Sequence, residues 1–162
     1  FIMITDAAIN IAPDVETQIG IVENALPVAR ALGVECPKVA VLSAVENVTD
    51  KMPSTVTARE IAERGVEGCV ISGPLALDGA ISMESVKHKA IKDPVAGQAD
   101  ILLVPFIEIG NVLYKACSYI AGKTMASTIC GASCPVIITS RADTPDSKYY
   151  SILMAVLRCL KA

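Results

Sequence analysis

The sequence predicts an α/β fold in which a parallel sheet is flanked by helices. Short apolar runs rich in β-branched residues alternate along the chain with longer segments of helical periodicity. Each run is apolar throughout rather than alternately polar, so we expect strands that are buried on both faces, as in parallel sheets. The expected strands cover residues 1–5, 38–44, 68–73, 101–105 and 135–140.

Helices are expected between these strands. The first covers residues 14–33, because the carboxylate of Asp14 can cap its free amides and Gly33 can end it. Pro27 inside this helix should kink or split it, since proline has no amide hydrogen to donate. The other helices are expected over residues 55–64, 83–91, 108–122 and 146–161, and the last has apolar residues at the three-and-four spacing of an amphipathic helix.

Composition argues against several classes of function. With 14 basic and 17 acidic residues and a net charge of −3, the chain has no basic stripe for nucleic acid. The longest uncharged stretch, residues 124–140, contains glycine, proline, hydroxyls and thiols, so we expect no membrane span. Six irregularly spaced cysteines with one histidine do not predict a metal site, and we expect buried, reduced thiols in a cytoplasmic protein. His88 lies in a polar segment and is expected at the surface.

The apolar content suggests a chain that is partly covered by other protein. Apolar residues make up 52% of the sequence and the mean hydropathy is +0.52. The first residue is Phe1 rather than Met, within a strand-like run. We therefore expect a piece of a longer protein, or a subunit whose apolar surface meets another copy.

Polar or small residues follow four of the five expected strands, and in open α/β sheets ligands bind beyond the carboxyl ends of the strands. Each residue alone could be a turn former, a helix cap or a surface ion pair. Together, glycine-containing loops, helix N-termini and an arginine suit a phosphate-bearing ligand. The chain has neither a P-loop nor a dinucleotide-binding fingerprint. The residues are Asp6 and Asn10, then Gly73, Pro74 and Asp78, then Glu108, Gly110, Asn111 and Lys115, and finally Ser140, Arg141, Asp143 and Asp146.

Five blocks of the chain resemble the phosphate acetyl/butyryl transferase family. They read TDAAINIAPD (5–14), PKVAVLSAVE (37–46), GPLALDGAIS (73–82), KHKAIKDPVAGQADILLVPFIEIGNVLYK (87–115) and PVIITSRADT (135–144). The SRAD ending and the KHKAIKDPVAGQAD block look closer to the phosphate butyryltransferase branch than to the acetyl branch.

The resemblance implies an enzyme that interconverts acyl-CoA plus phosphate with acyl phosphate plus CoA. It implies no metal or redox cofactor, coenzyme A as a substrate, and a homodimer or higher homo-oligomer. Family members are about twice as long and resemble isocitrate and isopropylmalate dehydrogenases, with two α/β domains. On that pattern the N-terminal half is absent, residues 1–128 form the second domain, and residues 129–162 return to the first.

The resemblance also assigns roles to the strand-end residues. Ser140 and Arg141 match the pair that binds phosphate or acyl phosphate, Arg141 by neutralising charge and Ser140 by donating a hydrogen bond to the developing oxyanion. The acetyl branch has its proposed base seven residues after the serine, where this chain has Ser147, so Asp146 and Asp143 are the candidates.

Further residues shape the expected substrate site. The remaining candidates for substrate binding are Gly73, Pro74, Asp78, Glu108, Gly110, Asn111 and Lys115. Phe106 and Ile109 depart from the residues that the family usually has, which would change the polarity of the loop or the shape of the acyl pocket.

Two other functions stay open from the sequence. A metal- and NAD(P)-dependent dehydrogenase could use the same fold, but it needs clustered metal ligands that the chain does not suggest. Alternatively, the chain could be an inactive domain that dimerises or binds a ligand. With half of the cleft missing, we expect little or no activity from these 162 residues alone.

Overall fold

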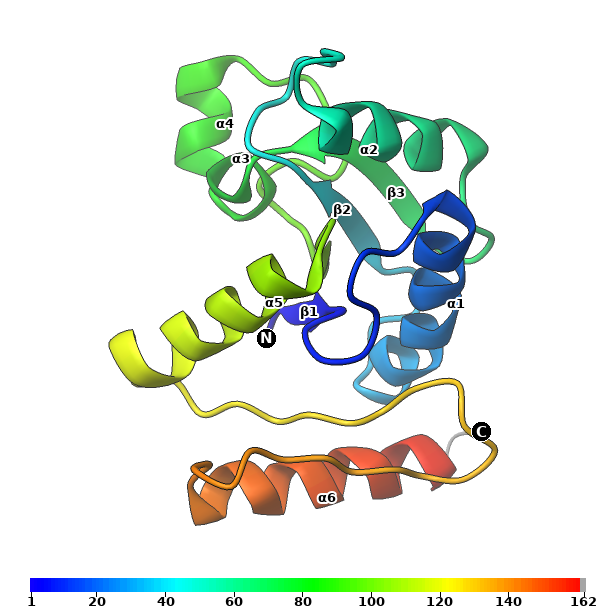
Figure 1. The fold of residues 1–162 in the computed structure, drawn as a ribbon, viewed down its shortest axis with the longest axis vertical. Helices are drawn as coiled ribbons and strands as arrows, with labels where there is room; N and C mark the ends of the chain where they lie inside the picture. The colour runs from blue at the N-terminus through cyan, green and yellow to red at the C-terminus, as the bar shows by residue number, and fades with distance from the viewer. Residues whose placement is uncertain (161–162) are drawn as a thin grey trace.

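In a computed structural model, which describes residues 1–160, the chain folds around a four-stranded parallel sheet (Figure 1). The strands are β1 (Met3–Thr5), β2 (Lys38–Leu42), β3 (Val70–Leu75) and β4 (Ile101–Leu103). Their order across the sheet is β1-β4-β2-β3, and every neighbouring pair is parallel. The predicted α/β class and the first four predicted strands are therefore confirmed.

The fifth expected strand was wrong, because residues 135–140 do not join the sheet. A single antiparallel bridge connects Val136 to Ile129. The hydroxyls of Ser127 and Thr128 donate to the carbonyls of Ile138 and Val136, over 2.9 and 3.1 Å. A β-branched run becomes a regular strand only where a neighbouring strand can take its backbone hydrogen bonds, and the described residues provide none here.

The first helix, α1 (Val15–Ala31), forms as predicted, but Pro27 does not split it. The carboxylate of Asp14 accepts the amide of Thr17 over 2.9 Å, and Gly33 follows the helix with a φ of +93°. Pro27 and Glu23 are both exposed, so water can reach the carbonyl that proline leaves without a donor. Water can thus replace the hydrogen bond that the proline removes, which reduces the free-energy cost of Pro27 in the helix.

The other helices follow the prediction with small changes. They are α2 (Pro53–Arg64), α3 (Leu77–Ile81), α4 (Met83–Lys89), α5 (Ile107–Lys115), its continuation as the π-helical turn η1 (Ala116–Ile120), and α6 (Pro145–Leu160). The short helix α3 was not predicted, since one and a half turns are too few to show a hydrophobic period. Figure 1 shows α6 lying apart from the sheet, and it contacts α1.

Two apolar cores lie on the two faces of the sheet. Successive residues of a strand point to opposite faces, so β2 sends Val39 and Val41 into one core and Ala40 and Leu42 into the other. The first core is completed by Val22, Leu26 and Ile61, and the second by Ala80, Val86 and Val95. This burial on both faces explains why the runs are apolar throughout.

Within residues 1–160, no helix has both the length and the apolar character required to cross a bilayer.

Candidate active site

The loop after β1 is built around the carboxylate of Asp6. Its Oδ1 accepts the amides of Ala8 and Ile9 over 2.8 and 3.0 Å, and its Oδ2 accepts the amide and the side-chain nitrogen of Asn10 over 2.8 and 2.7 Å. Partial burial acts to raise the pKa of Asp6, but these hydrogen bonds outweigh it and hold the pKa below its ordinary value. Asp6 is thus a turn former that is ionised at neutral pH.

Acid should destabilise this loop through Asp6. Because its pKa is depressed in the folded protein, its stabilising effect is full above the ordinary value of 3.8 and is lost as the pH falls through the folded value. We expect Asp6→Asn to reduce the free energy of unfolding by about 1 kcal/mol at pH 7 and to flatten its fall below pH ~4. Denaturant unfolding from pH 7 to 3 measures both, with Asp50→Asn, at an exposed side chain, as the control. Parallel pH curves for wild type and Asp6→Asn would contradict the assignment.

Gly110 allows α5 to pack directly on this loop. A Cβ at Gly110 would lie 2.6 Å from the carbonyl oxygen of Asp6 and 2.8 Å from the Cα of Ala7, so only glycine fits. The amide of Ile107, at the start of α5, also donates to the carbonyl of Ile11 over 3.1 Å. Since β1 and β4 are parallel neighbours, the segments that follow them meet at the carboxyl ends of these two strands.

Ser140, Arg141 and Asp143 form a turn that is bonded to α5. The amide of Ser140 donates to Oδ2 of Asp143 over 2.7 Å, and the amide of Asp143 donates to the carbonyl of Ser140 over 3.1 Å. The hydroxyl of Tyr114, on α5, donates to the carboxylate of Asp143, with 3.0 and 3.1 Å to its two oxygens. Ser140 and Arg141 are exposed at this turn. The predicted Ser-Arg pair is therefore connected to α5 through Asp143 and Tyr114. The same helix packs, at Gly110, on the loop after β1.

The two candidate bases and Ser147 differ in their surroundings. Ser147 is only 5% exposed, and its amide donates to the hydroxyl of Thr144 over 3.2 Å at the start of α6. Asp143 already accepts the hydrogen bonds of the turn, whereas Asp146 is exposed in the first turn of α6. A carboxylate at that place is favoured by the helix dipole.

Three further candidates share one face of α5. Glu108, Asn111 and Lys115 are spaced three and four residues apart, and all three are exposed. Gly110 and Tyr114, four residues apart, share the face of α5 that meets the neighbouring loops. Asn111 and Tyr114, three residues apart, are neighbours on the helix surface, so the exposed polar stripe borders the face that supports the site.

The candidates from the third strand lie at the opposite edge of the sheet. Three strand spacings separate β3 from β1, roughly 14 Å at about 4.8 Å per strand. Gly73 and Pro74 are buried within β3, and a Cβ at Gly73 would lie 2.8 Å from the Cβ of Val41. The exposed Asp78 pairs with Lys89 over 3.0 Å, and this hydrogen bond lowers the pKa of Asp78. These residues do not contact the Ser140 turn in the described chain, so any role in substrate binding stays a prediction.

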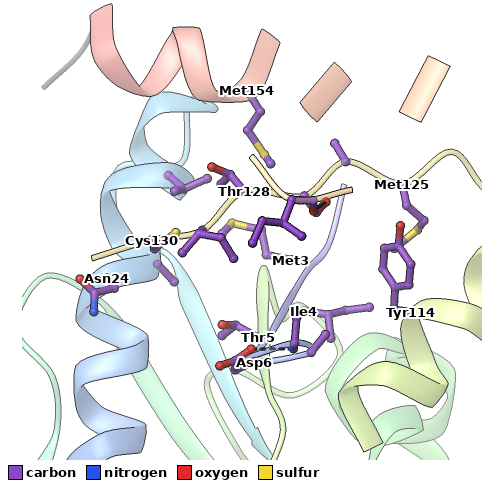
Figure 2. A pocket seen from close by; sticks show the side chains of 18 of the residues that line it. Met3, Ile4, Thr5, Asp6, Asn24, Tyr114, Met125, Thr128, Cys130 and Met154 are labelled. Atoms are coloured by element: carbon purple, nitrogen blue, oxygen red, sulfur yellow. Dashed lines mark hydrogen bonds between the residues drawn. The ribbon is translucent and has the colours of Figure 1, made fainter. Parts of the chain in front are cut away.

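A cavity of about 760 Å³ lies between β1, α1, the segment 124–130 and α6. Figure 2 shows Asn24 of α1 and Tyr114 of α5 on opposite sides of it, with Met154 reaching in from α6. Most of its lining is apolar, and Asp6 lies at its floor beside Thr5. The cavity borders the site but is not lined by Ser140 or Arg141.

The expectation that the cysteines are buried was wrong. Cys36, Cys134 and Cys159 are exposed, and the other three are partly exposed. Cys36 and Cys134 lie in bends, and Cys159 lies on an exposed face of α6. His88 is exposed on α4, as predicted. Within residues 1–160, no group of three or more His, Cys, Asp or Glu side chains is arranged to hold a metal ion.

Comparison with known proteins identifies the family. The family model described as phosphate acetyl/butaryl transferase matches residues 1–156. The chain belongs to this family. The resemblance seen in the sequence blocks is thereby confirmed.

Relatives of both branches of the family match almost the whole chain. A probable phosphate butyryltransferase of Bacillus subtilis (strain 168) is 49% identical over 94% of this chain and 52% of that protein. A phosphate acetyltransferase of Thermotoga maritima is 44% identical over 96% and 54%. The crystal structure of a branched-chain phosphotransacylase from Enterococcus faecalis V583, 44% identical, matches with a TM-score of 0.92 over 98% of this chain and 58% of that chain. The chain spans about half the length of the curated relatives it matches.

Tyr114 is the residue that reasoning from the sequence missed. It lies inside the matched block, between Asn111 and Lys115, but a tyrosine in a helix usually indicates packing. The available signal was its position four residues after Gly110, which places both on one helix face. Its partner Asp143 was named only as a candidate base.

Proposed function

We propose that the protein containing this chain is a phosphotransacylase, which interconverts acyl-CoA plus phosphate with acyl phosphate plus CoA. The observation that carries the proposal is the Ser140–Arg141 turn, which is bonded through Asp143 to Tyr114 of α5, the helix that packs on the loop after β1, in a chain of this family. An exposed arginine on a closed turn suits a phosphate dianion, since its guanidinium can donate two parallel hydrogen bonds.

The reaction needs charge stabilisation and one proton transfer. A phosphate oxygen attacks the thioester carbonyl, the carbon–sulfur bond breaks, and the thiolate of CoA leaves and takes up the proton that hydrogen phosphate loses. Arg141 would hold the phosphate, and Ser140 would donate a hydrogen bond to the oxygen that becomes negative. In the reverse direction a base must deprotonate the thiol. Because Asp143 is engaged in the turn, we favour the exposed Asp146 as this base.

Substrate contacts are proposed for the remaining candidates. Glu108, Asn111 and Lys115 form an exposed stripe on α5, the helix whose Tyr114 is bonded to the turn. This position supports contacts of the three side chains with CoA or the acyl group. Phe106 and Ile109, 43% and 45% exposed, add apolar surface beside that stripe and suit an aliphatic acyl chain longer than acetyl. Butyryl-CoA, or a similar short chain, is therefore the proposed substrate, and no metal or redox cofactor is invoked.

The complete protein is proposed to have two α/β domains like those of isocitrate and isopropylmalate dehydrogenases. Residues 1–128 would belong to the second domain and residues 129–162 to the first. The two-way division is supported by α6 and the segment before it, which lie outside the sheet. A cytoplasmic homodimer or higher homo-oligomer is proposed, and the exposed apolar residues Tyr119 and Ile120 support an interface at η1.

A coupled thiol assay tests the activity. The protein that contains this chain is incubated with butyryl-CoA or acetyl-CoA, with and without phosphate, and free CoA is measured with a thiol reagent. We expect phosphate-dependent release of CoA that is faster with butyryl-CoA. If phosphate does not increase CoA release from either substrate, the proposal is wrong. The family match does not favour the dehydrogenase alternative, which would require NAD(P) binding by spectral titration.

A further inference from the structure

The turn at Ser140 is closed from both ends. The amide of Asp143 donates to the carbonyl of Ser140, while the amide of Ser140 donates to the carboxylate of Asp143. The amide of Ala142 lies 3.4 Å from the hydroxyl of Ser140. Arg141 and Ala142 therefore occupy the tip of a four-residue turn, and both are exposed there. The orientation of the turn that contains Arg141 therefore depends on the position of the Asp143 carboxylate.

Tyr114 holds that carboxylate in place. Its phenol lies within hydrogen-bond distance of both oxygens of Asp143, and the side chain is partly buried. Burial, together with the hydrogen bond to Asp143 and the negative charge of that carboxylate, raises the pKa of Tyr114 to about 12. The phenol is therefore protonated across the neutral range and remains a donor.

This hydrogen bond joins two parts of the chain. In the described residues, the side-chain hydrogen bonds of segment 124–160 otherwise stay within that segment, as between Ser127 and Ile138 or between Ser127 and Ser151. Tyr114 is the residue that bonds the segment to the preceding chain. One helical turn earlier, Gly110 packs against the backbone of Asp6 and Ala7. The position of the turn relative to the loop after β1 is thus set through one helix, α5.

We propose that Tyr114 is a positioning residue for the phosphate-binding turn. By donating to Asp143 it fixes the orientation of Ser140 and Arg141 relative to α5 and the end of β1. The inference rests on the proposed phosphotransacylase function for what the turn binds, but the tether itself is a property of the fold. Tyr114 does not contact the reacting atoms, so its removal should change the placement of Arg141 while the rest of the site is kept.

Tyr114→Phe tests the proposal, because it removes one hydroxyl and leaves the ring. The matched control is Tyr149→Phe, since Tyr149 is 62% exposed on α6 and its ring packs edge-on against Tyr150, a contact that phenylalanine keeps. In the protein that contains this chain, we expect Tyr114→Phe to lower kcat/KM for phosphate at least tenfold, with most of the change in KM for phosphate. Tyr149→Phe should stay within twofold of wild type.

A double-mutant cycle and hydrogen exchange separate positioning from general stability. Asp143→Asn weakens the same contact, so Tyr114→Phe should have little further effect in that background. Amide exchange in residues 137–144 should rise at least tenfold in Tyr114→Phe, while exchange in β2 and β4 stays unchanged. Full additivity of the two substitutions, or faster exchange spread over the whole sheet, would overturn the proposal.

The outcomes for function and for positioning are distinguishable. If the wild-type protein releases no CoA on addition of phosphate, the proposed function is wrong, and the exchange measurement still decides whether Tyr114 tethers the turn. If the wild type is active but Tyr114→Phe matches Tyr149→Phe in both kinetics and exchange, the positioning role is wrong and the function stands.

Discussion

Replacing Arg141 with alanine should lower kcat/KM for phosphate-dependent CoA release by about a hundredfold to a thousandfold. This corresponds to about 3 to 4 kcal/mol of lost transition-state stabilisation, the range expected when a charged donor to a developing anion is removed. The guanidinium is exposed at the tip of a closed turn, so the substitution leaves no cavity and no unpaired buried group. The fold should therefore survive, and the loss should appear in catalysis alone.

Two further variants show whether charge or geometry matters. Arg141→Lys keeps the positive charge but cannot donate two parallel hydrogen bonds, so we expect an intermediate loss. Arg59→Ala removes an exposed arginine from α2 and should leave the kinetics at the wild-type level. Steady-state rates at varied phosphate measure all three. Equal kcat/KM for Arg141→Ala and wild type would exclude Arg141 from phosphate binding.

Replacing Gly110 with alanine should reduce the free energy of unfolding by about 2 to 3 kcal/mol. The added Cβ would lie 2.6 Å from the carbonyl oxygen of Asp6 and 2.8 Å from the Cα of Ala7, and both are backbone atoms that cannot rotate away. Either α5 moves out or the loop after β1 is distorted. Because Tyr114 lies on the same helix, the substitution should also weaken phosphate binding.

Gly20→Ala is the matched control for Gly110→Ala. Both glycines lie inside helices, and both substitutions gain the helix propensity of alanine, worth about 1 kcal/mol. A Cβ at Gly20 would meet nothing within 4 Å, so this variant should be more stable than wild type. Denaturant unfolding of the three proteins gives the difference directly. An equal gain in both variants would mean that α5 does not pack tightly on the loop.

The sequence was sufficient where structure depends on residues close together in the chain. Runs that are apolar throughout predicted four of the strands and their burial on both faces, because this pattern is needed for a strand between two layers of helices. Asp14 and Gly33 predicted the ends of α1, because caps act within a single helical turn. The matched blocks predicted the family, which the comparison confirmed.

The site was predicted only in part, since a list of strand-end residues does not say which strands are neighbours. The order β1-β4-β2-β3 places Gly110 beside Asp6 and moves Gly73 and Asp78 to the far edge. From the sequence, Gly73 and Gly110 had looked equivalent as parts of glycine-containing loops. In the fold each glycine instead allows a close backbone approach, one to β2 and the other to the loop after β1.

The sequence by itself determined the α/β class, the first four strands, most of the helices and the family. The tertiary structure alone decided that residues 135–140 lie outside the sheet and that Tyr114 holds Asp143, 29 residues further along the chain. The physical reason is the range of the forces involved. Hydrophobic periodicity and capping depend on near neighbours, whereas a strand's partner or the acceptor of a side-chain hydroxyl depends on how distant segments pack.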